Sequence, residues 1–138
     1  MAKKLLIHKL DVSDMGMPGS GGVAAQCWLA GNFVYMTGQT GFTLTGELVG
    51  IGDPAAQAMQ ACENIKTLME MAGGQLSDVI KIITYVTDRE HRKVIYPVIR
   101  GYFEPLRPCG TGIIVKGLAR EELLVEIDAW GFIDDPDK

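Results

Sequence analysis

The sequence predicts an α+β domain in which two helices pack on one face of a mixed β-sheet. Three observations support this fold class: apolar runs typical of strands, one long segment with helical periodicity, and the order strands, helix, strand, helix, strands. The chain has 138 residues, of which 47% are hydrophobic, and this is enough for one core. We therefore expect one domain over residues 1–138, with its core at about residues 24–130 and a polar tail at 134–138.

The first predicted unit is a β-hairpin. Residues 24–29 and 33–37 are apolar-rich, and they flank a Gly-Asn pair at 31–32 that tolerates positive φ angles. Residues 41–52 contain Gly46 between a Thr and a Glu, which indicates a loop or a second turn leading out of the sheet.

The long helical segment follows this loop. Asp53 can accept from the free backbone N–H groups of a helix start, and Pro54 at the first helical position lacks an N–H that would have no partner there. A Gly-Gly pair at 73–74 supplies a left-handed stop. Apolar residues recur at helical spacing and predict one amphipathic helix; they are Ala55, Ala58, Met59, Cys62, Ile65, Met69 and Ala72.

The second half of the chain alternates between strands and a helix. Residues 78–87 are rich in β-branched side chains and predict a strand with its even-numbered residues on one face and its odd-numbered residues on the other. A second helix is expected within residues 89–103, where Pro97 cannot donate an interior hydrogen bond and therefore starts or kinks the main segment. Two final strands are expected at about residues 112–115 and 123–130, separated by a charged turn.

One layer of helices leaves the second face of the predicted sheet uncovered. That face is partly apolar, so it needs a partner in water. Closed cyclic assembly of identical chains meets this need, although residue spacing alone leaves both two and three copies open.

Composition argues against several function classes. The net charge of −4 and the isoelectric point near 5.1 offer no basic surface for nucleic acid. The apolar stretch at residues 5–7 is too short for a secretory signal, and no window approaches the roughly 20 apolar residues of a membrane-spanning helix. Three cysteines without paired spacing suggest neither a disulfide framework nor a zinc site. We expect a cytoplasmic protein with no cofactor, no metal, no nucleic-acid partner and no membrane contact.

A set of residues spread over most of the chain occurs in the order and near the spacing of a known family. They are Thr37-Gly38-Gln39, Gly46, Asp53, Gln57, Asn64, Leu68, Ala72-Gly73, Asp78-Val79, Lys81, Asp88, Phe103, Pro108 and Val125-Glu126-Ile127. From about residue 24 to residue 129 the sequence resembles the Rid family of YjgF-type reactive-intermediate deaminases, formerly described as endoribonuclease L-PSP. The resemblance implies a chorismate-mutase-like fold and a homotrimer with a small-molecule site in each of three intersubunit clefts. It also implies hydrolysis of enamine or imine compounds to a keto acid and ammonia.

The chain departs from the active members of that family at the substrate anchor. Those members carry an Arg two residues after the Pro that corresponds to Pro108, and its guanidinium forks onto the substrate carboxylate. Gly110 stands there in this chain. Further substitutions are Ala24 for an aromatic residue, Thr37 for Ser, Tyr96 for Asn and Gly112 for Cys. Glu126 keeps its type, so the resemblance is to a subgroup that lacks the active-site Arg.

Glu126 is the candidate catalytic residue. It shares one face of the predicted last strand with Asp128, opposite its apolar neighbours. A carboxylate there can orient a water for attack on a C=N carbon and carry its proton, provided that burial raises its pKa. The alternative is an exposed strand carboxylate, or one paired with Lys81 or Lys116.

Seven residues are candidates for substrate binding: Thr37, Gly38, Tyr96, Arg107, Gly110, Thr111 and Gly112. Gly38 allows close backbone approach at a strand end, beside the Thr37 hydroxyl. The segment 110–112 offers bare amide donors that can replace part of the lost guanidinium. Arg107 can restore a bidentate carboxylate clamp from a new position. The corresponding alternatives are a simple turn, a flexible glycine segment and a surface arginine.

Other reactive side chains have no partners at useful spacing. Cys109 has no histidine nearby in the sequence to activate it, so a packed or unreactive thiol is the alternative to a nucleophile. His8 and His91 stand alone, which does not favour metal binding. Two hypotheses follow: a Rid-type hydrolase of a small C=N or enamine compound, and a small-ligand-binding or regulatory trimer without chemistry.

Overall fold

The computed structural model describes residues 3–105 and 107–134. In chain order, its elements are β1 (Lys4–Asp11), β2 (Val23–Ala30), β3 (Phe33–Met36), α1 (Pro54–Met71), η1 (Leu76–Asp78), β4 (Val79–Val86), η2 (Arg89–His91), α2 (Arg92–Phe103), β5 (Cys109–Ile114) and β6 (Val125–Phe132). The predicted α+β class is confirmed. The polar tail expected beyond residue 134 lies outside the described residues.

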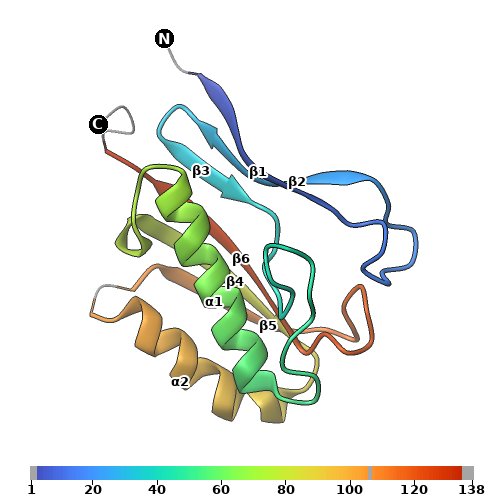
Figure 1. Ribbon diagram of the computed structural model, residues 1–138. Helices are drawn as coiled ribbons and strands as arrows, with labels where there is room; N and C mark the ends of the chain where they lie inside the picture. Colours follow the sequence, from blue (N-terminus) through green and yellow to red (C-terminus); the bar gives the residue numbers. More distant parts are fainter. Residues whose placement is uncertain (1–2, 106, 135–138) are drawn as a thin grey trace.

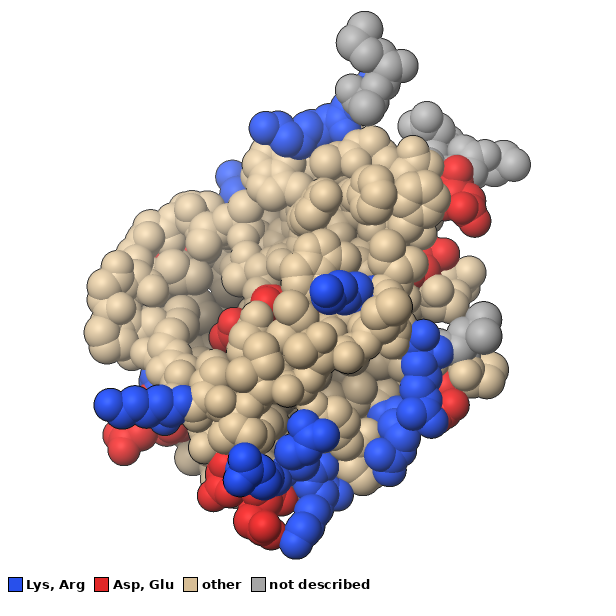
Figure 2. Space-filling view, turned by 180° about the vertical axis from the view of Figure 1, so that it is seen from behind, with Lys and Arg blue, Asp and Glu red and all other residues tan. Residues whose placement is uncertain are grey.

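The strands form one mixed sheet in the order β1-β2-β3-β6-β4-β5. β4 and β5 are parallel, and the other neighbours are antiparallel. Figure 1 shows α1 and α2 side by side over the same face of this sheet. We call the opposite face the open face, because no helix of the described residues covers it; in Figure 2 few charged side chains lie over its middle.

Local chemistry explains where α1 begins and ends. The Asp53 carboxylate accepts from the Ala56 backbone N–H at 3.1 Å, and Pro54 takes the first helical position, as the sequence predicts. Gly73 has a φ of 97°, a left-handed conformation that stops the helix. The inner face of α1 packs on the sheet with fully buried side chains such as Ile65, each contributing about 1.5–3 kcal/mol.

Two buried amide side chains fix the long loop between β3 and α1. Gln57 Nε2 donates to the carbonyls of Gly50 and Glu122, at 3.1 and 2.9 Å. Asn64 Nδ2 donates to the Phe42 carbonyl at 2.7 Å. Since a buried polar group without a partner costs about 1–3 kcal/mol, these bonds favour one position for the loop. The loop is thereby held against the start of β6, where the site lies.

The structure corrects the predicted strands in two places. β1 pairs with β2, and no strand was predicted there, because Leu5 and Leu6 are both exposed and give no alternation. In β4 a register shift between Val79 and Lys81 places Val79 in the core and leaves Ile80 47% exposed. The predicted alternation therefore holds only from Ile82 onward.

The second helix also differs from the prediction. α2 runs from Arg92 to Phe103 with Pro97 inside it rather than at its start. Because Pro97 has no N–H, the Lys93 carbonyl lacks its usual helical donor, but Lys93 is exposed and water can take that place.

Candidate functional site

A pair of carboxylates lies on the open face of β6. Val125 and Ile127 are fully buried against the helices. Glu126 and Asp128 alternate with them and therefore point to the open face. Gly38, just after β3, passes close to both acids: a Cβ on Gly38 would overlap the Glu126 carboxylate and lie 2.9 Å from Asp128 Oδ1. The missing side chain makes room for the two carboxylates.

The Glu126 carboxyl is partly buried and has a shifted pKa. Burial raises the pKa of Glu126 above its ordinary value, and the negative charge of Asp128 raises it further. Among the ion pairs of the described residues, none involves Glu126 with Lys81 or Lys116. A carboxyl with a raised pKa keeps its proton closer to neutral pH, which suits proton exchange with a ligand.

Tyr85, on the neighbouring strand β4, contacts this pair of carboxylates. It lies on β4 in register with Glu126, and its hydroxyl donates to Asp128 Oδ2 at 2.8 Å. The same hydrogen bond raises the pKa of Tyr85. Neither Tyr85 nor Asp128 was predicted from the sequence to be part of a site. Alternation along β6 could have indicated Asp128, whereas Tyr85 depends on the β4–β6 register, which only the folded sheet defines.

Thr37 and Gln39 fix the backbone around Gly38. The Thr37 hydroxyl donates to the Ala25 carbonyl at 2.7 Å. Gln39 exchanges two backbone hydrogen bonds with Ile127, both 2.8 Å long. The Thr37 hydroxyl proton is thus engaged in an intramolecular hydrogen bond, but the hydroxyl oxygen can still accept a hydrogen bond from a ligand.

A cavity of about 250 Å³, which we call the glutamate cavity, is lined in part by Glu126, Thr37 and Gly38. Glu126, Thr37 and Gly38 form its polar wall, and apolar side chains such as Met15 and Met17, from the loop between β1 and β2, form the facing wall. In Figure 2 the molecule is hollowed on this side, with acidic atoms at the edge of the hollow. The apolar wall limits the access of water to the carboxyl and so contributes to its raised pKa.

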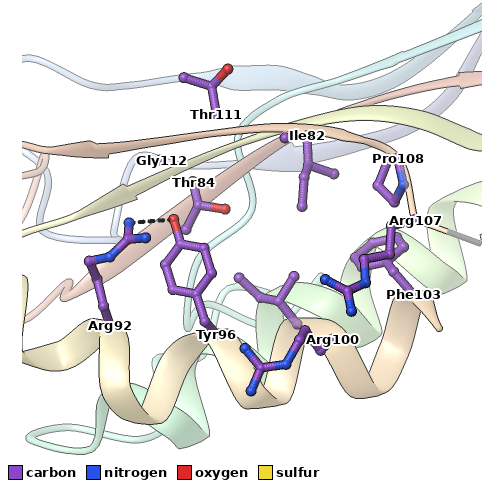
Figure 3. A pocket seen from close by; sticks show the side chains of 12 residues that line it. Ile82, Thr84, Arg92, Tyr96, Arg100, Phe103, Arg107, Pro108, Thr111 and Gly112 are labelled. Carbon is purple, nitrogen blue, oxygen red and sulfur yellow. Dashed lines mark hydrogen bonds between the residues drawn. The ribbon is translucent and has the colours of Figure 1, made fainter. Parts of the chain in front are cut away.

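The other candidate residues line a cavity of about 330 Å³ between α2 and β5, which we call the arginine cavity. Figure 3 shows Tyr96 rising from α2 toward β5, whereas the Thr111 side chain points away to the far side of the strand. A Cβ on Gly112 would overlap the Tyr96 hydroxyl. The Tyr at 96 and the Gly at 112 are therefore coupled, because the large side chain fills the space that a Cys at 112 would need.

Arg107 lies at the edge of the arginine cavity, next to the segment that enters β5. Its Nη2 is 2.6 Å from Glu104 Oε1, and the two side chains are 57% and 45% exposed. An ion pair this exposed contributes little to stability. The guanidinium therefore stays accessible on this side of the sheet, together with Gly110, which also lines the cavity.

The remaining reactive side chains are separate from both cavities or lack partners. Cys109 is exposed on β5. His8 Nε2 lies 3.1 Å from the Leu44 carbonyl, and His91 Nδ1 is buried with no hydrogen-bond partner. Over residues 3–105 and 107–134, no group of three or more His, Cys, Asp or Glu side chains is placed to hold a metal ion. Within those same ranges, no helix is both long and apolar enough to cross a bilayer.

Comparison with known proteins identifies the family. Residues 23–133 match the family described as endoribonuclease L-PSP. A RutC family protein of Pyrococcus horikoshii is 37% identical over 112 residues, which cover 80% of this chain and 87% of the relative. The chain belongs to the endoribonuclease L-PSP family.

Solved structures of similar proteins share the fold. RidA from an Antarctic Psychrobacter is 35% identical with a TM-score of 0.73, covering 86% of this chain and 95% of that one. A Mycobacterium tuberculosis protein of the YjgF/YER057c/UK114 family is 30% identical with a TM-score of 0.71, covering 80% and 86%. A Pseudomonas aeruginosa protein of unknown function is 28% identical with a TM-score of 0.77, covering 97% and 95%. The resemblance to the Rid family is thereby confirmed.

In this family member, the two cavities lie on opposite sides of one sheet. Glu126 is in register with Tyr85 on β4, and Tyr85 is in register with Ile113 on β5. Glu126 is thus only two strands from β5, but its side chain points to the open face, whereas Tyr96 lies on the helix side. One chain alone does not present Glu126 and Tyr96 to the same small ligand.

Proposed function

We propose that this protein hydrolyses small C=N or enamine compounds in the clefts of a homotrimer, with Glu126 as the catalytic residue. The observation that carries the proposal is the Glu126 carboxyl itself. It is partly buried, has a raised pKa and opens into a cavity beside the bare backbone of Gly38. Each cleft would combine the glutamate cavity of one protomer with the arginine cavity of the next.

Aromatic side chains on the open face support assembly. Tyr35 is in register with Trp28 on one side and with Trp130 on the other. Phe33 packs edge-to-face on Phe132, with ring centroids 5.0 Å apart. Phe33 and Tyr35 are 43% and 47% exposed in the single chain. A contiguous aromatic surface of this kind is typical of interfaces between proteins.

In the proposed reaction, Glu126 moves protons between water and nitrogen. Its carboxylate takes a proton from a water molecule while the water oxygen bonds to the carbon of C=N and the π electron pair moves to nitrogen; the Glu126 carboxyl then donates that proton to nitrogen, which gives a carbinolamine. The Glu126 carboxylate next takes the hydroxyl proton and passes it to nitrogen as the C–N bond breaks and the C=O bond forms, and ammonia leaves. One imine and one water give one carbonyl compound and one ammonia.

Gly110 predicts a specificity different from that of Arg-bearing relatives. An Arg–carboxylate hydrogen bond contributes roughly 1.5–3 kcal/mol, so its loss alone lowers the turnover of a simple aliphatic imino acid by about one to two orders of magnitude. Turnover equal to that of an Arg-bearing protein would contradict this expectation.

The assembly is tested first, since the site depends on it. Light scattering at micromolar concentration should give a particle three times the 15.0 kDa mass of the chain. A stable monomer would remove the intersubunit site and the proposal with it.

The chemistry is tested with imines released from alanine and phenylalanine by an amino-acid oxidase, following keto-acid formation. Glu126→Gln should lower turnover by roughly 10²–10⁴-fold, the usual contribution of a general acid or base. Stability should change by no more than about 1 kcal/mol, since Gln is nearly isosteric. Glu121→Gln, at an exposed turn, is the matched control and should leave turnover unchanged. A Glu126→Gln variant that unfolds or dissociates would instead assign Glu126 a structural role.

A second function is favoured by the bare Gly110, which offers no charged anchor on β5. Under this alternative the trimer binds a small ligand in the same clefts without converting it. Mass spectrometry of small molecules that co-purify with the protein would distinguish the two, because a bound metabolite recovered intact after incubation indicates binding alone. Glu126→Gln would then change affinity by a modest factor and have no rate to reduce.

A further inference from the structure

The arginine cavity concentrates positive charge in a negatively charged protein. The sequence has five arginines within a net charge of −4. Three of them, Arg92, Arg100 and Arg107, line this one cavity, and none of its described lining residues is acidic. Figure 3 shows Arg92, Tyr96 and Arg100 on successive turns of α2, with Arg107 facing them from the other end.

Two of the three guanidinium groups have no carboxylate partner within the described part of the chain. Arg107 pairs with Glu104, whereas the ion pairs found in residues 3–105 and 107–134 include neither Arg92 nor Arg100. Both side chains are exposed at the mouth of the cavity. Their charges are available to an anion that enters from solvent.

Arg92 is already ordered for such a contact. Its Nη1 donates to the Tyr96 hydroxyl at 2.9 Å, and its guanidinium carbon lies 4.1 Å from the centre of the Tyr96 ring. Gly112 permits this arrangement, because a Cβ there would lie 2.7 Å from Arg92 Nη1 and overlap the Tyr96 hydroxyl. Among the described residues no other hydrogen bond is found for the Arg92 guanidinium, and an ordered arginine loses less entropy when it binds.

β5 adds backbone donors beside the arginines, and apolar side chains of β4 and α2 form the floor of the cavity. The Val115 N–H bonds to β4 at the Val86 carbonyl. Since N–H groups alternate between the two edges of a strand, those of Gly110 and Gly112 point to the free edge of β5. Ile82 and Phe103 form an apolar floor. The cavity therefore offers cations and a surface for a flat apolar group, and amide donors lie beside it at the edge of the described sheet.

We propose that the arginine cavity binds the carboxylate of a small aromatic acid through Arg92 and Arg100, with Tyr96 holding Arg92 in place. The two helix arginines supply positive charge from α2, without reproducing the bond that an Arg at position 110 on β5 would make. The volume of about 330 Å³ suits a small aromatic acid. The assignment of this acid as the substrate rests on the proposed function, but the anion site stands on the cavity alone.

Benzoate and benzamide provide the test, because they share one shape and differ in charge. In a ligand-observed NMR titration of the purified protein, benzoate should bind saturably, and benzamide should bind at least about tenfold more weakly, since it lacks the charge-assisted bonds. Arg92→Gln and Arg100→Gln should each weaken benzoate binding by about tenfold, at the lower end of the range for such bonds. Raising the salt concentration should weaken benzoate binding as well.

Two further variants keep the test interpretable. Arg92→Lys retains the charge and should bind benzoate better than Arg92→Gln, even if Tyr96 moves. Arg89→Gln removes an exposed arginine of η2 that does not line the cavity, and it should leave binding unchanged. The inference is overturned if benzoate does not saturate, if benzamide binds equally well, or if Arg89→Gln has the same effect as Arg92→Gln. If the wild-type protein binds benzoate through its arginines but shows no imine turnover, the proposed function is overturned and the anion site is not.

Discussion

The glutamate cavity and the arginine cavity are built in the same way but carry opposite charge. In each, one glycine makes room for functional side chains: Gly38 for the carboxylates of Glu126 and Asp128, and Gly112 for Tyr96 and Arg92. One cavity has acidic and apolar walls on the open face, and the other has basic and aromatic walls on the helix side.

Under the proposed function, this difference keeps proton transfer and anion binding apart. A carboxylate next to an arginine would form an ion pair, and its pKa would fall. Placing Glu126 in an apolar cavity on the other side of the sheet lets burial raise its pKa instead. A ligand that needs both groups must then be held between two copies of the chain.

The largest expected effect comes from closing the gap at Gly38. Gly38→Ala adds a methyl group where the Glu126 carboxylate lies, and the side chain must rotate away. Turnover should fall by roughly 10²–10⁴-fold, as for loss of the general base itself. Gly117→Ala, where an added Cβ meets no atom within 4 Å, should have no effect. Kinetic assays of both variants check this, and full activity in Gly38→Ala would mean that the position of the carboxylate is not critical.

The next effect is a gain of activity. A Cβ at Gly110 would meet only Ile82, at 3.9 Å, so the strand has room for a side chain there. Gly110→Arg should raise turnover of the alanine-derived imine by about 10–100-fold, because it adds a charge-assisted bond to the carboxylate. Gly110→Gln, which has no charge, serves as the control. Equal rates in the two variants would show that charge at this position does not anchor the substrate.

A smaller effect is expected at the second glycine. Gly112→Ala displaces the Tyr96 hydroxyl and Arg92 Nη1 from the strand, so benzoate affinity should fall by about tenfold, the contribution of one charge-assisted hydrogen bond. Gly101→Ala on the exposed side of α2 meets no neighbouring atom and is the control. An NMR titration measures both, and unchanged affinity in Gly112→Ala would separate the Tyr96–Arg92 contact from anion binding.

The proximity of Asp128 to Glu126 should affect the pH dependence of kcat/KM. Asp128 raises the pKa of Glu126 through its negative charge, so Asp128→Asn should lower that pKa and move the acid limb of kcat/KM toward lower pH. The shift should be no more than about one pH unit, because burial remains the larger cause. Glu121→Gln should not move the profile. A shift of the acid limb to higher pH in Asp128→Asn would contradict the electrostatic assignment.

The smallest effect concerns stability. The folded-state pKa of Glu126 is raised from its ordinary value of 4.5. Wild type should therefore lose stability relative to Glu126→Gln as pH rises from about 4.5 through that raised pKa, and the difference should level off above it. Urea unfolding of both proteins at pH 4 and pH 8, at one protein concentration, measures this. A wild type that gains stability over the variant with rising pH would indicate an unseen cationic partner for Glu126.

Several elements could be predicted from local sequence because their causes are local. Asp53 and Pro54 define the start of α1 through bonds within four residues, and Gly73 ends it by adopting a left-handed φ. Alternation along residues 125–128 is enough to place Glu126 on the face opposite the core. The sequence alone also indicated the family, since its motif residues are spread over most of the chain.

Tertiary structure decided what surrounds those residues. β1 could not be recognised locally, because its exposed leucines gain their partner only when β2 is present. The contact of Tyr85 with Asp128 depends on the register of β4 and β6, and the approach of Gly38 to Glu126 depends on how β3 meets β6. The candidate residues were expected in intersubunit clefts, and within one chain they line two separate cavities. The sequence by itself therefore determined residue types and strand faces, whereas the pairing of distant strands determined which side chains meet, because that pairing is set by long-range packing.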